Sequence, residues 1–257
     1  YQKLSIDGHQ GETGKFYEAM IRSLSAAIRF ANRYAAQAEN MAEACPDESR
    51  ADEYRLIAKI CRRVPEYPAT SFHEAVQSVY FIHLLAQIES GGNSISLGRI
   101  DQILYPYYKQ DLADGRITPR AARELMALLF LKTNEIWNVL EEAYIPGGEG
   151  AEGKTTQNVT VGGMDQNGQD ATNELSHIAL DAYADIRTVQ PNFGVRLSSQ
   201  SPDFFLSRAV EYAKDGVLMN FFNDDAIVPA LVYAGHSIES ARDYGVVGCL
   251  EPNAQGK

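Results

Sequence analysis

A thiol and a carboxylate stand two residues apart near the end of the sequence, in Gly248-Cys-Leu-Glu-Pro252. If the chain is extended here, Cys249 and Glu251 share one face with about 7 Å between their Cα atoms, and Leu250 points away. The two groups could then act on adjacent atoms of one small substrate. Pro252 cannot donate a hydrogen bond to a strand ladder, so we expect the strand to stop there.

The pair is weak evidence by itself, because a single cysteine near a glutamate is more often a buried structural thiol beside a surface acid. Gly245 and Gly248 allow a tight backbone path around it. Cys45 and Cys61 lie in or beside helical segments without a similar neighbour, so we interpret them as structural. Three cysteines without a CxxC pair predict neither a disulfide framework nor a zinc site, and they favour a reducing compartment.

Alternating strands and helices after residue 150 must position this pair. Strand patterns cover 158–162, 192–197, 217–222 and 245–249, and helical patterns cover 172–186, 202–216, 225–233 and 237–244. This order indicates parallel strands with right-handed crossovers, hence an open doubly wound sheet or part of an α/β barrel. Chemistry gathers at the carboxyl ends of the strands in both architectures, and we expect Cys249 and Glu251 at such an end.

The first part of the chain is predicted to be mainly helical. Apolar residues at steps of three and four predict a helix over 15–44. A capping box of Ser71 and Glu74 opens a second helix over 72–89, and Thr118 caps a third that runs to about residue 142. We therefore divide one catalytic domain into a helical part, 1–150, and a strand-helix part, 151–257.

Composition excludes several classes of function. The 257 residues carry 23 Lys and Arg against 34 Asp and Glu, a formal net charge of -11 that repels nucleic acid and anionic membrane surfaces. No apolar run approaches the roughly 20 residues that cross a bilayer. We expect a soluble, cytoplasmic protein without nucleic-acid or membrane partners and without a bound metal.

Several motifs in order give the chain a family resemblance. They are Ser94-Ile-Ser-Leu-Gly-Arg-Ile-Asp-Gln102, Tyr105-Pro-Tyr-Tyr108, Gln157-Asn-Val-Thr-Val-Gly-Gly163, Asp170-Ala-Thr-Asn-Glu-Leu175, Phe221-Phe-Asn-Asp224 and Gly248-Cys-Leu-Glu-Pro252. With them the chain resembles the glycyl radical enzymes of the pyruvate formate-lyase superfamily, closest to the dehydratase and C–X lyase branch. The resemblance implies a ten-stranded α/β barrel whose central finger loop carries the active-site cysteine.

The resemblance also implies roles and partners. It assigns a transient thiyl radical to Cys249 and a general-base role to Glu251, and it implies a small hydroxylated or amino substrate. The stored radical would lie on a glycine in an Arg-Val-x-Gly loop that this sequence does not contain, installed by a radical S-adenosylmethionine activating enzyme. We therefore expect an internal segment, inactive alone, of a homodimeric enzyme of anaerobic metabolism, with a bacterial microcompartment as one setting.

Substrate-binding residues are also implied by position. Diol dehydratases that resemble this chain have His-Ser where Asn93-Ser94 stands, and many relatives have an aromatic residue where Thr155-Thr156 stands. An asparagine cannot carry the charge of a histidine, so glycerol and propane-1,2-diol are disfavoured as substrates. Phe221 is a further candidate for the pocket wall, with core packing as the alternative.

Alternatives stay open at this point. Arylacetate-type radical decarboxylases also place a glutamate two residues after the cysteine, and the chain could belong to a catalytically silent homologue. Acyl transfer by paired cysteines is disfavoured, because Leu250 stands where the second thiol would be. Among structural interpretations, Arg99 and Asp101 are expected to pair with each other, and the acidic pair at 224–225 is expected to cap a helix.

Overall fold

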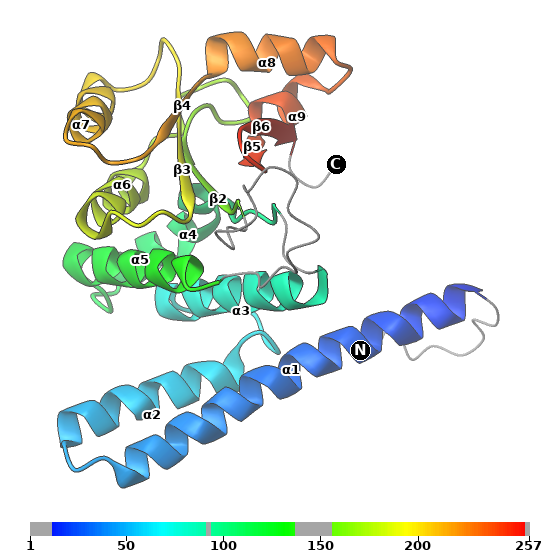
Figure 1. Cartoon of the computed structure of the whole chain (residues 1–257), viewed down its shortest axis with the longest axis vertical. Coiled ribbons are helices and arrows are strands. Elements are labelled where there is room, and N and C mark those ends of the chain that lie inside the picture. Colours follow the sequence, from blue (N-terminus) through cyan, green and yellow to red (C-terminus); the bar gives the residue numbers. More distant parts are fainter. Residues whose placement is uncertain (1–11, 91–93, 137–155, 255–257) are drawn as a thin grey trace, which may run out of the picture. The chain divides into compact units, whose positions relative to one another are not determined.

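A computed structural model describes residues 12–90, 94–136 and 156–254 (Figure 1). The chain forms two compact units, residues 1–82 and residues 83–257. The boundary that we predicted at residue 150 falls among residues outside the described ranges and stays a prediction. No helix in the described part of the chain is long and apolar enough to cross a membrane.

The first unit is built on two helices, α1 (Glu12–Ala44) and α2 (Glu48–Arg63). The predicted helix over 15–44 is confirmed, and its alanines at three- and four-residue steps are buried. Asp47 begins α2 by accepting hydrogen bonds from the amides of Ser49 and Arg50. Arg62 of α2 reaches Glu39 of α1 at 2.8 Å, so a surface ion pair joins the two helices.

Helix α3 (Phe72–Ser90) confirms the second predicted helix and crosses from the first unit into the second. Only half of its capping box forms. The Ser71 hydroxyl accepts from the amide of Glu74 at 3.2 Å, whereas the Glu74 carboxylate turns to the amide and hydroxyl of Thr70.

The second unit is built on a parallel sheet of four strands, in the order β1 (Gly98–Arg99), β2 (Asn158–Gly162), β3 (Asn192–Leu197) and β4 (Asn220–Asn223). Asn158 lies opposite Asn192, and Arg196 lies opposite Phe222. The predicted α/β class with parallel strands is therefore confirmed. The predicted strand over 217–222 was wrong at its start, since β4 begins only at Asn220.

Helices connect and cover these strands. They are α4 (Ile100–Ala113), α5 (Pro119–Asn134), α6 (Glu174–Ile186), α7 (Asp203–Lys214), α8 (Asp224–Tyr233) and α9 (Ile238–Arg242). Helix α5 ends at Asn134, with Glu135 as its C-cap, whereas we predicted that it runs to about residue 142. Phe193 of β3 stacks on Tyr183 of α6, with ring centroids 4.6 Å apart, and meets Phe130 of α5 edge-on.

The last segment is an antiparallel hairpin of β5 (Tyr244–Val247) and β6 (Glu251–Ala254), which we call the Cys hairpin. The prediction that Cys249 ends a strand of the parallel sheet was therefore wrong. The chain turns back at residues 248–250, and Pro252 lies inside β6 opposite Val246. A proline fits there because a strand at an edge needs no further N–H donor.

Candidate active site

Cys249 lies at the tip of the Cys hairpin, in the turn formed by Gly248, Cys249 and Leu250. The turn needs a left-handed residue, and Gly248 provides it with φ of 59°. Cys249 is exposed, and Leu250 is 54% exposed. The extended geometry that we assumed for residues 249–251 is thus replaced by a tight turn.

The Glu251 carboxylate folds back over this turn. It accepts a hydrogen bond from the amide of Leu250 at 2.9 Å. Its Oε2 also occupies the space that a Cβ at position 248 would need, so a larger residue there would displace this carboxylate as well as strain the left-handed backbone. The carboxylate consequently lies against the same turn that carries Cys249, with Leu250 between the two in sequence.

The sheet has two different faces, and the Cys hairpin covers one of them. The strand register places on one side, which we call the hairpin face, Asn158, Thr160, Gly162, Asn192, Gly194, Arg196, Asn220 and Phe222. Phe222 packs in one cluster with Tyr244 and Val246 of the hairpin, which fixes this assignment. Alternation along the strands places Val159, Val161, Phe193, Val195 and Phe221 on the opposite side, the helix face, where α5 and α6 pack on Phe193.

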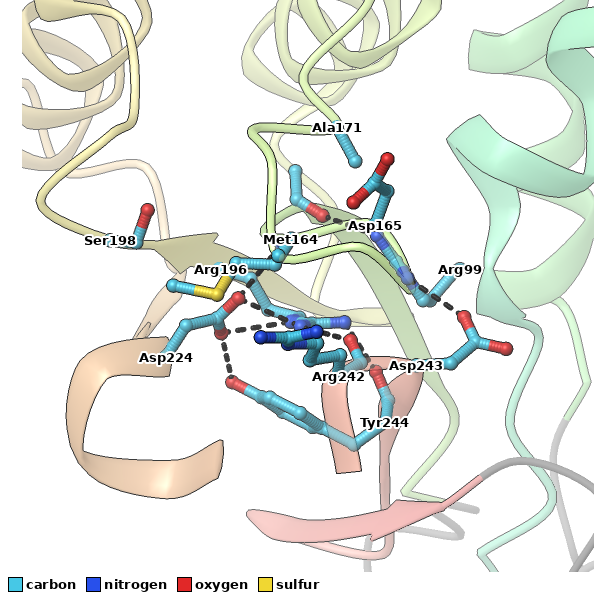
Figure 2. A network of polar contacts seen from close by, with 12 residues as sticks. Arg99, Met164, Asp165, Ala171, Arg196, Ser198, Asp224, Arg242, Asp243 and Tyr244 are labelled. Atoms are coloured by element: carbon cyan, nitrogen blue, oxygen red, sulfur yellow. Dashed lines mark hydrogen bonds and ion pairs between the residues drawn. The ribbon is translucent and has the colours of Figure 1, made fainter. Parts of the chain in front are cut away.

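A buried ion pair anchors the base of the Cys hairpin, as Figure 2 shows. The guanidinium of Arg196 makes two hydrogen bonds to the Asp224 carboxylate, at 3.0 and 2.7 Å, and both side chains are 0% exposed. Arg196 also donates to the carbonyl oxygens of Arg242 and Tyr244, each at 2.7 Å. One side chain of β3 therefore holds the main chain where β5 begins.

The Tyr244 side chain completes this anchor (Figure 2). Its hydroxyl donates to Asp224 at 2.7 Å, and its ring lies 3.8 Å from the Arg196 guanidinium carbon. Burial raises the pKa of Tyr244, so the hydroxyl keeps its proton for this hydrogen bond. We had expected Asp224 to cap α8, but Asn223 caps it and Asp224 instead balances the charge of Arg196.

Arg99 and Asp101 also differ from our expectation. Arg99 pairs with Asp243 at 2.8 Å and donates to the Gly162 carbonyl at 3.1 Å. Asp101 accepts from the amide of Gly162 and from the hydroxyl of Ser176. Burial raises the pKa of Asp101 and lowers that of Arg99. Both residues thus hold structure beside the hairpin face.

The paired glycines that end β2 make room for Arg196. Gly162 and Gly163 have φ of 73° and 83°. A Cβ at Gly162 would lie 2.7 Å from the Arg196 carbonyl oxygen, and one at Gly163 would lie 2.5 Å from its Nε. Any other residue at these positions would displace the anchor of the hairpin.

Two of the predicted substrate-binding residues are brought together. The hydroxyls of Ser94 and Thr156 lie 2.9 Å apart, although 62 residues separate them in sequence. Both backbones are left-handed, with φ of 65° and 48°, a conformation that is costly for a β-branched residue and that clusters at functional sites. Asn93 and Thr155, the neighbours that we predicted to bind substrate with them, lie outside the described residues.

Phe221 is not brought to the hairpin. It is 44% exposed on the helix face, while the adjacent Phe222 is buried against the hairpin. The polar residues of the hairpin face were missed as functional candidates. The alternation of polar and apolar residues along Asn158-Val-Thr-Val161 could have identified them, because it indicates that one side of a buried strand contacts polar groups.

No group of three or more His, Cys, Asp or Glu side chains suited to a metal ion occurs within the described ranges. Burial lowers the pKa of His83, which lies 2.5 Å from the Gln157 side chain and 3.2 Å from that of Gln87. This buried group holds α3 to the start of β2.

Known proteins resemble this chain over nearly its whole length. A family model described as pyruvate formate lyase-like matches residues 1–257. Isethionate sulfite-lyase of Nitratidesulfovibrio vulgaris is 36% identical over 245 residues, which are 93% of this chain and 29% of the relative. Trans-4-hydroxy-L-proline dehydratase of Clostridioides difficile is 34% identical over 242 residues, 93% of this chain and 30% of the relative.

A solved structure from work on 1,2-propanediol dehydration in Roseburia inulinivorans superposes with a TM-score of 0.93 and 38% identity. It covers 100% of this chain, which spans 33% of that protein. The chain thus spans about a third or less of the length of these relatives. The sequence motifs, the fold and these comparisons agree, and the chain belongs to the pyruvate formate lyase-like family.

Proposed function

We propose that this chain is the cysteine-bearing part of a glycyl radical enzyme that acts as a dehydratase or C–X lyase. The observation that carries the proposal is the turn at the tip of the Cys hairpin, with the Cys249 thiol exposed and the Glu251 carboxylate folded against the same turn. Relatives with 34 to 36% identity are named as a dehydratase and a sulfite-lyase, which supports this class of reaction.

The proposed mechanism uses both groups in turn. The stored radical, on a glycine outside this chain, would accept the hydrogen atom of the Cys249 thiol. The Cys249 thiyl radical then takes a hydrogen atom from a substrate carbon, and Glu251 takes a proton from an adjacent hydroxyl or ammonium group. A leaving group departs from the next carbon, and the Cys249 thiol returns its hydrogen atom to the product radical.

This function implies the rest of the proposed assembly. The four parallel strands would form part of a ten-stranded barrel, with the hairpin face inside and the helix face outside. A radical S-adenosylmethionine enzyme would install the stored radical, and the enzyme would be a homodimer. The exposed thiol at a turn fits these needs, because it can approach both a glycine loop and a substrate.

The substrate is proposed to be a small hydroxylated or amino compound. The paired hydroxyls of Ser94 and Thr156 would face its polar groups, together with Asn93 and Thr155. The named substrates of the relatives include a sulfonate and a hydroxylated amino acid, so the leaving group must be found by assay. A panel of hydroxylated, amino and sulfonated compounds, analysed for products, would identify it.

The test is Cys249→Ser in the full-length protein, activated and assayed on this panel. Electron paramagnetic resonance should show the stored radical at the wild-type level. Turnover should be abolished, because a serine O–H bond is too strong for the glycyl radical to break. Cys45→Ser is the matched control, since Cys45 lies in the turn after α1, where its thiol donates to the carbonyl oxygen of Asp47 at 3.4 Å. Wild-type turnover by Cys249→Ser would exclude the proposed function.

A further inference from the structure

We propose that Asn158 and Thr160 are positioning residues that set the place of Cys249, a role that rests on the function proposed above. Both side chains are 0% exposed, and both project from β2 on the hairpin face. The Thr160 hydroxyl accepts a hydrogen bond from the amide of Val246 at 3.1 Å. The Asn158 side-chain amide donates to the carbonyl oxygen of Gly248, the residue before Cys249.

These contacts form a regular series along the hairpin. Together with the two Arg196 bonds, side chains of the sheet hold the main chain at residues 242, 244, 246 and 248, which is every second residue up to the turn. Among the described residues, the hydrogen bonds between the sheet and β5 all come from side chains of the sheet. The distance between Cys249 and the sheet is therefore set by the length of these side chains.

The carboxamide of Asn158 can be oriented without ambiguity. Its Nδ2 lies near two carbonyl oxygens, that of Gly248 and, at 3.5 Å, that of Thr156. Carbonyl oxygens only accept, so the amino group must face them. Thr156 in turn contacts Ser94, which means that one amide connects the cysteine turn with the proposed substrate-binding hydroxyls.

Position matters here because the proposed chemistry moves hydrogen atoms. The Cys249 S–H bond breaks as a C–H bond forms at the radical glycine, and the reverse transfer restores both groups. Such steps require close approach of the reacting atoms, and a displacement of about 1 Å can lower the rate about 100-fold. Cys249 and Leu250 are exposed, and the hydrogen bond from the Leu250 amide to Glu251 lies within the turn itself, so it does not fix the turn to the sheet.

Asn158→Asp in the full-length, activated protein tests the first residue. A carboxylate oxygen would then face the Gly248 carbonyl, and the repulsion should displace the turn. We expect wild-type radical content and about a 100-fold loss of kcat. Asn192→Asp is the matched control, because Asn192 is the partner of Asn158 on β3 and its side chain accepts from Gln190. It should retain wild-type kcat.

A second readout reports the approach of Cys249 without substrate. Thiol hydrogens exchange with solvent, so in D₂O the transfer between Cys249 and the glycine replaces the glycine hydrogen by deuterium and removes its splitting from the radical spectrum. This exchange should slow in Asn158→Asp by about the same factor as kcat. A residue with only a structural role would alter thermal stability and leave this exchange unchanged.

Thr160 provides a pair of variants of nearly equal size. Thr160→Val removes the acceptor of the Val246 amide, and we expect both kcat and the deuterium exchange to fall about fivefold. Thr160→Ser keeps the hydroxyl, so kcat and the deuterium-exchange rate should both stay at wild-type values. This pair keeps the proposal testable if Asn158→Asp does not fold.

The outcomes separate this proposal from the proposed function. If Cys249→Ser retains turnover, the function itself fails. If Cys249→Ser is inactive while folded Asn158→Asp keeps the wild-type kcat and exchange rate, the function stands and the positioning role of Asn158 is overturned. Equal loss in Thr160→Val and Thr160→Ser would likewise overturn the role of the Thr160 hydroxyl.

Discussion

The two faces of the parallel sheet are built from opposite kinds of residue. The helix face presents valine and phenylalanine to α5 and α6, and Val159, Val161, Phe193 and Val195 are all 0% exposed. On the hairpin face Asn158, Thr160 and Arg196 are likewise 0% exposed, yet they present polar side chains to the main chain of the Cys hairpin. The helix face therefore contributes packing, whereas the hairpin face contributes directional bonds that place one turn.

The largest expected effect is a loss of turnover. It comes from a substitution at the tip of the Cys hairpin, whose main chain is held by side chains of the hairpin face. Glu251→Gln keeps the shape of the side chain and removes the proposed base, so turnover should fall about 10²- to 10⁴-fold. Radical content should stay at the wild-type level, because the proposed function places the stored radical on a glycine outside this chain. Steady-state rates beside spin quantitation would check this, and a Gln variant with most of its turnover would exclude elimination with Glu251 as the base.

Arg196→Met tests the base of the same hairpin. It leaves the Asp224 carboxylate buried without its partner, which should lower the free energy of unfolding by about 3–5 kcal/mol. Arg123→Met is the control, since Arg123 pairs with Asp185 where its side chain is 37% exposed, and it should cost less than about 1 kcal/mol. Urea unfolding measures both. Equal losses would show that burial does not distinguish the two pairs.

Val161→Thr tests the apolar helix face. The substitution nearly keeps the volume but puts a hydroxyl among buried apolar groups, at a cost of about 1–3 kcal/mol. Val189→Thr, at a position that is 48% exposed, should change stability by less than about 0.5 kcal/mol. Thermal unfolding would check the difference, and a neutral Val161→Thr would mean that the helix face tolerates polar groups as the hairpin face does.

The smallest effect is expected at the hydroxyl pair. Thr156→Val removes the hydroxyl that lies 2.9 Å from that of Ser94 and should raise KM about fivefold, with kcat retained. Steady-state kinetics on the substrate that the panel identifies would measure both constants. A change in kcat with an unchanged KM would place Thr156 in the positioning of the cysteine turn instead of in substrate binding.

The sequence predicted the helix face better than the hairpin face. Strands β2 and β3 were predicted at their true bounds, because their valines and phenylalanines recur at every second position between turn residues. The place of the Cys249 segment was not predicted, since an antiparallel hairpin with a proline in β6 differs from a strand of the sheet only through long-range contacts. Local pattern carries no information about which side chain meets which distant carbonyl.

The same limit explains the charged residues. Asp224 stands at the start of a helix, where an acidic residue usually caps, so its pairing with Arg196 could not be read from neighbours in sequence. Arg99 and Asp101 are two residues apart but belong to β1 and α4, and their side chains find different partners. The motif around Cys249 and Glu251 was visible because its residues are contiguous.

Attachment of the Cys hairpin through side chains has an evolutionary consequence. Two strands joined by main-chain bonds can shift only by whole residues, about 3.3 Å at a time, and a one-residue shift reverses every side chain. A strand held by side chains can move by fractions of that step when a tethering residue is replaced. We expect relatives with different substrates to differ in the height of this hairpin above the sheet by less than one residue step, which superposition of their solved structures would reveal.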